Sequence, residues 1–217
     1  MLSYPSPQAF QPDEDDQLMI RLQDGDQQAF NEIALAWQER LQRFFDRNTH
    51  DAAAAEDLAQ ETLLRLYRSF WDYIPRGMFR GFLFRIAQNL LIDQSRREKT
   101  DVLLHARKRP QATEGSDDYI NSIPDVSRSA EATAEQHELH DILGGLLHKL
   151  PEDQRMTFIL YYYQSLSLPE IACATSTGLS TVKSRLRLAR EKLRTMLIAL
   201  GFNHDWELAD DIDNNHN

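Results

Sequence analysis

The sequence has little cysteine, glycine or proline, and it has no long apolar run. Cys173 is the sole cysteine among 217 residues, which excludes an intramolecular disulfide framework and a cysteine-rich zinc site. Eight glycines and eight prolines leave room for long helices. No run approaches the ~18 apolar residues of a membrane span. Residues 1–20 carry acids and no basic segment, so we expect no signal peptide, no membrane insertion and a cytoplasmic location.

Charge is unevenly distributed along a chain whose net charge is −10. Residues 79–109 hold eight basic and three acidic side chains, and residues 178–200 hold six basic and one acidic. Acidic residues prevail in residues 1–62, 110–141 and 201–217. Each basic segment suits contact with a polyanion such as nucleic acid, but each is equally compatible with a solvated helix face.

The apolar spacing predicts an all-α protein with two small helical domains and a flexible linker, the second domain being a helix-turn-helix. A first short helix is predicted to end near Gly25–Asp26. Further helices are predicted over 27–48, 51–70, 78–99, 134–149, 151–163, 168–175 and 179–200. The region between the two predicted domains is rich in Pro, Gly, Ser and acidic residues, which is typical of a linker. The predicted parts are a disordered arm (1–12), a first domain (13–100), an acidic linker (101–133), a second domain (134–200) and an acidic tail (201–217).

The last predicted helix has one apolar stripe and one basic flank. A short helix and the turn Ser176–Gly178 precede it, which is the layout of a helix-turn-helix whose second helix enters the major groove. A three-helix bundle with a basic outer face would give the same pattern. The stripe contains Val182, Leu186, Ala189, Leu193, Met196, Leu197 and Leu200, and the flank contains Lys183, Arg187, Arg190 and Arg194, with hydroxyls at Ser180, Thr181 and Ser184.

The helix predicted over 78–99 has an aromatic-rich face and a face of amides and arginines. Amides can read bases and arginines can clamp phosphates, so this helix suits nucleic acid. Aromatic side chains near the preceding turn could stack on unpaired bases, although most of them could equally be core. The polar face contains Arg85, Gln88, Asn89, Ser95 and Arg96, and the aromatics are Phe70, Trp71, Tyr73 and Phe79.

A carboxylate cluster lies near the start of the third predicted helix, at Glu56, Asp57 and Glu61, with Gln60 beside them. Paired carboxylates could bind a metal or act as acid and base. A solvated helix start explains them as well, because acids are favourable in the first helical turn. No histidine lies at ligand spacing, and His137 and His140 with the distant Cys173 do not make a zinc site. We therefore expect no metal, no cofactor and no catalytic residue.

Several motifs occur in a specific order. The first half contains Gly25-Asp26, Ala55-Glu56-Asp57 and Phe79-Arg80-Gly81-Phe82, and the second contains Leu150-Pro151, Glu170-Ile171-Ala172 and Thr181-Val182-Lys183. With these motifs the chain resembles the bacterial RNA polymerase sigma factors of the small extracytoplasmic-function type. The first half resembles their second conserved region, and the second half resembles their fourth. Phe82, Gln88, Ser176 and Leu188 depart from the residues usual in that family.

The resemblance implies a protein that binds core RNA polymerase through the β′ clamp helices and the β flap and that directs promoter recognition, DNA melting and initiation. It also makes an anti-sigma factor a candidate partner. It implies polymerase contacts at Glu56, Asp57, Gln60 and Glu61. It implies contacts with the −10 element at Trp71, Tyr73, Arg76, Arg80, Arg85, Gln88, Asn89, Arg96 and Arg97. It implies contacts with the −35 element at Ser180, Thr181, Lys183, Ser184, Arg185, Arg187 and Arg190.

Two rival interpretations stay open at this point. One is a helix-turn-helix regulator that acts without recruiting polymerase, which predicts tight specific binding of DNA by the isolated chain. The other is an all-helical metal-dependent hydrolase that uses the carboxylate cluster, which predicts metal binding and loss of turnover on Glu56→Ala. The second lacks a nucleophile, a glycine-rich phosphate loop and a ligand set in the sequence.

Overall fold

The computed structural model describes residues 13–49, 51–108 and 143–202, with residues 98–108 as backbone alone. All regular secondary structure in this part of the chain is helical, which confirms the predicted all-α fold. Contacts between residues divide the chain into two units, Met1–Glu98 and Lys99–Asn217. The domain and linker bounds stay predictions, because the arm 1–12, residues 109–142 (with His137 and His140) and the tail from 203 lie outside the described residues.

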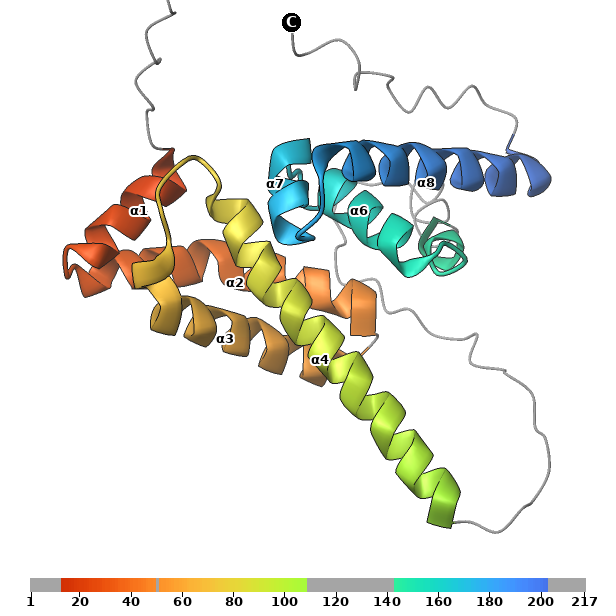
Figure 1. The fold of residues 1–217 in the computed structure, drawn as a ribbon, viewed down its shortest axis with the longest axis horizontal. Helices are drawn as coiled ribbons and strands as arrows, with labels where there is room; N and C mark the ends of the chain where they lie inside the picture. Colours follow the sequence, from red (N-terminus) through yellow and green to blue (C-terminus); the bar gives the residue numbers. More distant parts are fainter. Residues whose placement is uncertain (1–12, 50, 109–142, 203–217) are drawn as a thin grey trace, which may run out of the picture. The chain divides into compact units, whose positions relative to one another are not determined.

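The described residues between 13 and 108 form four α-helices and one short 3₁₀ helix (Figure 1). Their starts and ends follow the predicted pattern closely, apart from the end of the last one. The elements are α1 (Glu14–Gln23), α2 (Gln27–Thr49), α3 (Ala52–Ser69), η1 (Phe70–Asp72) and α4 (Phe79–Lys108).

Local signals in the sequence explain where these helices begin and break. The side chain of Asp51 caps α3 by accepting hydrogen bonds from the backbone nitrogens of Ala53 and Ala54 at 3.0 and 3.1 Å, as predicted. Asp13 caps α1 in the same way. Gly25 separates α1 from α2 with φ +97°, a left-handed conformation that glycine adopts without steric cost.

Helix α4 continues past its predicted end at Lys99 and reaches Lys108. The segment 100–108 contains neither glycine nor proline, and the next residue that cannot continue a helix is Pro110. The predicted linker (101–133) includes this segment because Pro, Gly, Ser and acidic residues dominate the region as a whole. In physical terms, polar residues alone do not end a helix, because their side chains can extend into solvent from its surface.

Aromatic side chains form the core where α2 meets α4. The ring of Trp37 lies 5.7 Å from that of Phe79 and 6.2 Å from that of Phe84, and Phe44 lies 5.2 Å from Phe84. All four residues are buried. Since the buried residues of α4 fall on one face, its opposite face is turned away from this core.

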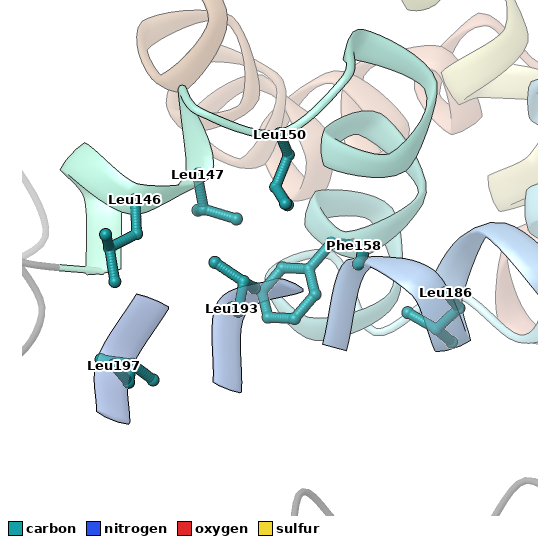
Figure 2. Close-up of a cluster of buried hydrophobic side chains, with 8 residues drawn as sticks. Leu146, Leu147, Leu150, Phe158, Leu186, Leu193 and Leu197 are labelled. Atoms are coloured by element: carbon teal, nitrogen blue, oxygen red, sulfur yellow. The ribbon is translucent and has the colours of Figure 1, made fainter. Parts of the chain in front are cut away.

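The second unit contains α6 (Glu152–Tyr162), α7 (Leu168–Ala174) and α8 (Leu179–Ala199), preceded by helical residues 143–147. Ser167 and Glu170 form a capping box that starts α7. Helix α8 packs against α6 and α7, and its leucines enter a common core (Figure 2). That core contains Leu146, Leu147, Leu150, Phe158, Leu186, Ala189, Leu193 and Leu197.

Two predictions about α8 need correction. Leu200 is 56% exposed rather than part of the buried stripe, because α8 ends at Ala199 and the next residue leaves its periodicity. Met196 is half-buried at the edge of the core. In the turn before α8, Gly178 is extended with φ −73°. Ser176 takes the left-handed conformation instead, with φ +52°.

Candidate functional site

The first turns of α8 expose short polar and basic side chains together. Ser180, Thr181, Lys183 and Ser184 are exposed, and the first turn carries no acidic residue. No described side chain caps the helix at Gly178. Backbone N–H groups at such a helix start favour an anion, and the side chains can donate to phosphates or base edges. This surface matches what a helix needs to enter a DNA groove.

Two arginines of α8 are engaged within the protein. Arg185 is half-buried and donates to the carboxylate of Asp153 in the first turn of α6. Nε of Arg190 donates to the hydroxyl of Tyr162 at 2.7 Å. Both were predicted to contact the −35 element, and both have a contact that orders them against α6. Arg187 is exposed and pairs with Glu191 at 2.6 Å along the helix surface, where such pairs contribute little to stability.

The outer face of α4 carries the residues predicted to contact the −10 element. Arg85, Asn89, Arg96 and Arg97 are exposed. The guanidinium of Arg85 lies 5.5 Å from the ring centre of Phe82, which orients it without neutralising its charge. These four side chains form a polar and basic strip.

Two further residues of the predicted −10 set are half-buried. Nε of Arg80 lies 4.0 Å from Oδ2 of Asp15, and it has no hydrogen-bond partner among the described residues. Oε1 of Gln88 is also buried without a partner in that part of the chain. Arg80 and Gln88 therefore border the exposed strip of α4 rather than lie within it.

Two aromatic residues predicted to contact the −10 element lie in the segment between α3 and α4, and one is exposed while the other is buried. Trp71 is 68% exposed at η1, and Arg76 is exposed further along. Tyr73 is only 5% exposed and its hydroxyl donates to Asp16. Burial, followed by this hydrogen bond, raises the pKa of Tyr73 well above its usual value. Tyr73 therefore lies outside the exposed surface, and its contact with the −10 element stays a prediction.

Trp71 ends a row of aromatic rings. Phe30 lies 4.8 Å from Tyr67, Tyr67 lies 5.8 Å from Phe70, and Phe70 lies 4.5 Å from Trp71, all between ring centres. The row supports Trp71 from behind while one side stays open to solvent.

The carboxylate cluster lies on the exposed face of α3. Glu56, Asp57 and Gln60 are exposed, and Nε2 of Gln60 donates to Glu56 at 3.2 Å. Glu61 is half-buried and pairs with Arg65 at 2.9 Å. Within the described residues, no group of three or more His, Cys, Asp or Glu side chains could hold a metal ion. The cluster is an acidic surface, suited to a basic partner.

Sequence reasoning missed the side chains that brace these surfaces from other helices. They include Asp16 and Gln23 of α1, which contact the segment before α4, and Asp153 and Tyr162 of α6. Their partners lie 28 to 61 residues away in sequence. No local pattern marks such contacts.

Comparison with known proteins identifies the family of the chain. Residues 34–100 match the model "Sigma-70 region 2", and residues 140–193 match "Sigma-70, region 4". The chain is 33% identical over 173 residues to the ECF RNA polymerase sigma factor SigW of Bacillus subtilis, covering 80% of this chain and 91% of the relative. It is 28% identical over 186 residues to the RNA polymerase sigma-H factor of Pseudomonas aeruginosa, covering 83% and 92%.

Solved structures show the same fold. The structure of CnrH in complex with the cytosolic domain of CnrY gives a TM-score of 0.60 at 22% identity, covering 86% of this chain and 99% of that one. The sigma factor RpoE in complex with the anti-sigma factor NepR from Bartonella quintana gives 0.58 at 22% identity, covering 78% and 96%. Among the described helices, none is long and apolar enough to cross a bilayer.

The two family models match in the order that the sequence motifs predicted, and the relatives align over most of both chains. Neither rival interpretation is favoured by these matches. The chain binds RNA polymerase and directs it to promoters. It belongs to the extracytoplasmic-function family of RNA polymerase sigma factors.

Proposed function

We propose that the two units divide the promoter between them. The second unit contacts the −35 element as duplex, and the first unit contacts core polymerase and one strand of the melted −10 element. The observation that carries this proposal is the start of α8, where Ser180, Thr181, Lys183 and Ser184 are exposed together without an acidic neighbour in the first turn.

In the second unit, α8 enters the major groove with its first turns leading. Lys183 and Arg187 reach phosphates or guanine edges, while the hydroxyls of Ser180, Thr181 and Ser184 reach base edges or phosphates. Arg185 and Arg190 keep their contacts with α6 and add positive charge beside the groove. Phosphate contacts position the helix, and base contacts give it specificity.

In the first unit, the exposed strip of α4 contacts the −10 element. Arg85, Arg96 and Arg97 neutralise phosphates, and Asn89 offers an amide to a base. Trp71 and Arg76 lie next to the start of this helix, where an aromatic face beside a cation suits an unstacked base.

The acidic face of α3 binds the polymerase. Glu56, Asp57 and Gln60 project into solvent and meet basic residues of the β′ clamp helices, with Glu61 at the edge of this contact. The second unit meets the β flap. The acidic linker passes through a basic channel of the polymerase, an inference from residues 110–141, which carry eight acidic and one basic side chain.

An anti-sigma factor that covers these surfaces would keep the protein inactive until it is released. Support comes from a structure of similar fold, that of RpoE in complex with the anti-sigma factor NepR. The site of action is the cytoplasm, where core polymerase and promoter DNA meet.

Runoff transcription with purified core polymerase tests the proposal. The full chain should bind core and confer a defined start site on a cognate promoter. The isolated chain should bind the same promoter weakly, because its net charge of −10 opposes DNA contact without polymerase. Failure to bind core, or tight specific binding of DNA by the chain alone, would refute it.

A further inference from the structure

Helix α1 fastens the segment that joins α3 to α4. Nε2 of Gln23 donates to the backbone oxygens of Phe70 and Tyr73 at 2.7 and 2.9 Å. Asp16 accepts from the hydroxyl of Tyr73 through Oδ1 and from the backbone nitrogen of Gly77 through Oδ2, the latter at 2.6 Å. Four hydrogen bonds from two side chains of α1 therefore hold residues 70–77. This segment runs beside α1 in Figure 1.

The position of Asp16 is unusual for a charged residue, because it is fully buried. A buried carboxylate is costly unless hydrogen bonds compensate its lost hydration, and here both oxygens receive one. Gly77 presents its N–H from a left-handed conformation with φ +66°, which glycine adopts readily. A glycine therefore stands at position 77, where the backbone is left-handed and the N–H points to Asp16.

Held and free side chains alternate along the same segment. Phe70, Tyr73 and Gly77 make the contacts with α1. Trp71 and Ile74, which lie between them, are 68% and 61% exposed, and Arg76 is exposed as well. Fixing the backbone at the held residues therefore also fixes where the exposed apolar and cationic side chains project.

We propose that Asp16 and Gln23 are positioning residues, which preset the segment 70–77 to receive an unstacked base of the melted promoter strand. The inference rests on the proposed role of Trp71 and Arg76 at the −10 element. An unheld segment would lose conformational freedom on binding DNA, whereas the hydrogen bonds from α1 have already ordered it in the free protein. Helix α1 precedes the residues matched by the region 2 model, 34–100, so that match does not assign it this role.

Arg21 provides a matched control on the same helix. It pairs with Asp26 at 2.7 Å and with Glu32 at 2.9 Å, which ties α1 to the following turn and to α2 but not to residues 70–77. Arg21→Gln should therefore weaken the attachment of α1 without releasing the segment. Gln23→Ala removes two hydrogen bonds to the segment, and Asp16→Asn leaves one acceptor where two were used.

The experiment uses holoenzyme assembled from core polymerase and the full chain. Three affinities are measured, for core, for a −35 duplex and for a single-stranded −10 oligonucleotide, together with the melting temperature of the chain. Gln23→Ala and Asp16→Asn should lower the affinity for the single strand about tenfold, the order expected from lost hydrogen bonds. Affinity for core and for the −35 duplex should stay within the range of Arg21→Gln.

Trp71→Ala separates the inference from the proposed function. If Trp71→Ala and Gln23→Ala both lose single-strand binding selectively, the inference is supported. If Trp71→Ala loses it while Gln23→Ala and Asp16→Asn match Arg21→Gln, the inference is overturned and the proposed function stands. A proportionate loss of core binding in Gln23→Ala also overturns it, because that marks a general structural defect. If Trp71→Ala changes nothing, the proposed role of this segment fails and the inference with it.

Discussion

Nε of Arg190 donates a hydrogen bond of 2.7 Å to the hydroxyl of Tyr162, which joins α8 to α6 behind the proposed −35 surface. The guanidinium also lies 5.8 and 5.5 Å from the ring centres of Tyr161 and Tyr162. An arginine held in this way presents its remaining N–H groups in one orientation. It therefore contributes both to the packing of the second unit and to its surface charge.

Arg190→Ala should lower stability and −35 affinity together, whereas Lys183→Ala should lower affinity alone. The first change removes a hydrogen bond and the contacts with two rings, a loss of about 1–2 kcal/mol in the free energy of unfolding. Lys183 is exposed, so its removal should change that free energy by less than about 0.5 kcal/mol. Urea unfolding of both variants checks this, and equal stabilities would contradict the role of Tyr162 as a partner of Arg190.

Lys183→Ala combined with Arg187→Ala should reduce initiation that depends on the −35 element while core binding stays unchanged. Each phosphate contact that is lost should also lower the slope of log affinity against log salt by about one. Runoff transcription and promoter titrations of holoenzyme at several salt concentrations measure both effects. Loss of core binding in this variant would mean that α8 faces the polymerase rather than DNA.

The sequence predicted the elements well where one local signal dominates. Asp51 caps α3 as its residue type suggests, and Gly25 breaks the chain between α1 and α2. The apolar spacing of α8 identified Leu186, Leu193 and Leu197 as core residues. Each of these depends on neighbours within a few residues, which a single sequence contains in full.

Side-chain direction outside regular helices could not be predicted. Trp71 and Tyr73 are both aromatic and only two residues apart, yet one is exposed and the other buried. The segment that holds them has no repeating geometry from which a face could be assigned. The ring of Tyr73 packs against Phe79 and Phe82, and its hydroxyl donates a hydrogen bond to Asp16, 57 residues earlier. Such a contact exists only once the helices have packed.

Charge reversal at Glu56 and Asp57 should weaken core binding. Both side chains are exposed on α3, so Glu56→Lys with Asp57→Lys should leave the fold intact and place like charges against a basic partner. We expect at least a tenfold loss of core affinity at low salt, about 1.4 kcal/mol, and a smaller loss at high salt because of screening.

The matched control is Glu39→Lys compared with Glu56→Lys alone, because each of these two variants reverses one charge. Glu39 is an exposed acid on α2 outside the proposed contact, and its salt bridge with Arg43 lies on the helix surface. Binding of labelled chain to core measures both variants. Equal losses in the two would show that overall charge matters rather than the face of α3.

The change in the free energy of unfolding caused by Asp15→Asn should be more stabilising at neutral pH than at acid pH. Burial is the main cause that raises the pKa of Asp15 above its usual value, while the hydrogen bond from Trp37 opposes this shift. The folded state therefore binds a proton more readily than the unfolded state. Stability from this group is fully present below the unfolded-state pKa and is lost as pH rises through the raised value.

An asparagine at position 15 can still accept the hydrogen bond from Trp37, but it cannot ionise. The difference in unfolding free energy between variant and natural protein should therefore be larger at about pH 7 than at about pH 4. Urea unfolding at several pH values measures it. A difference that does not change with pH would show that burial of Asp15 leaves its ionisation unaffected.

Ser176→Gly should stabilise the turn between α7 and α8. Ser176 holds φ +52°, a conformation that costs a residue with a Cβ about 1 kcal/mol or more and costs glycine little. Since glycine also loses more freedom on folding, the net gain should be about 0.5–1 kcal/mol. Gly178→Ser is the control: Gly178 is extended at the start of α8, and a Cβ there would meet only ordinary contacts, the nearest at 3.9 Å. That change should alter stability by only a few tenths of a kcal/mol. Thermal unfolding of both variants decides the matter, because a loss of stability in Ser176→Gly would mean that the serine side chain contributes more than its backbone strain costs.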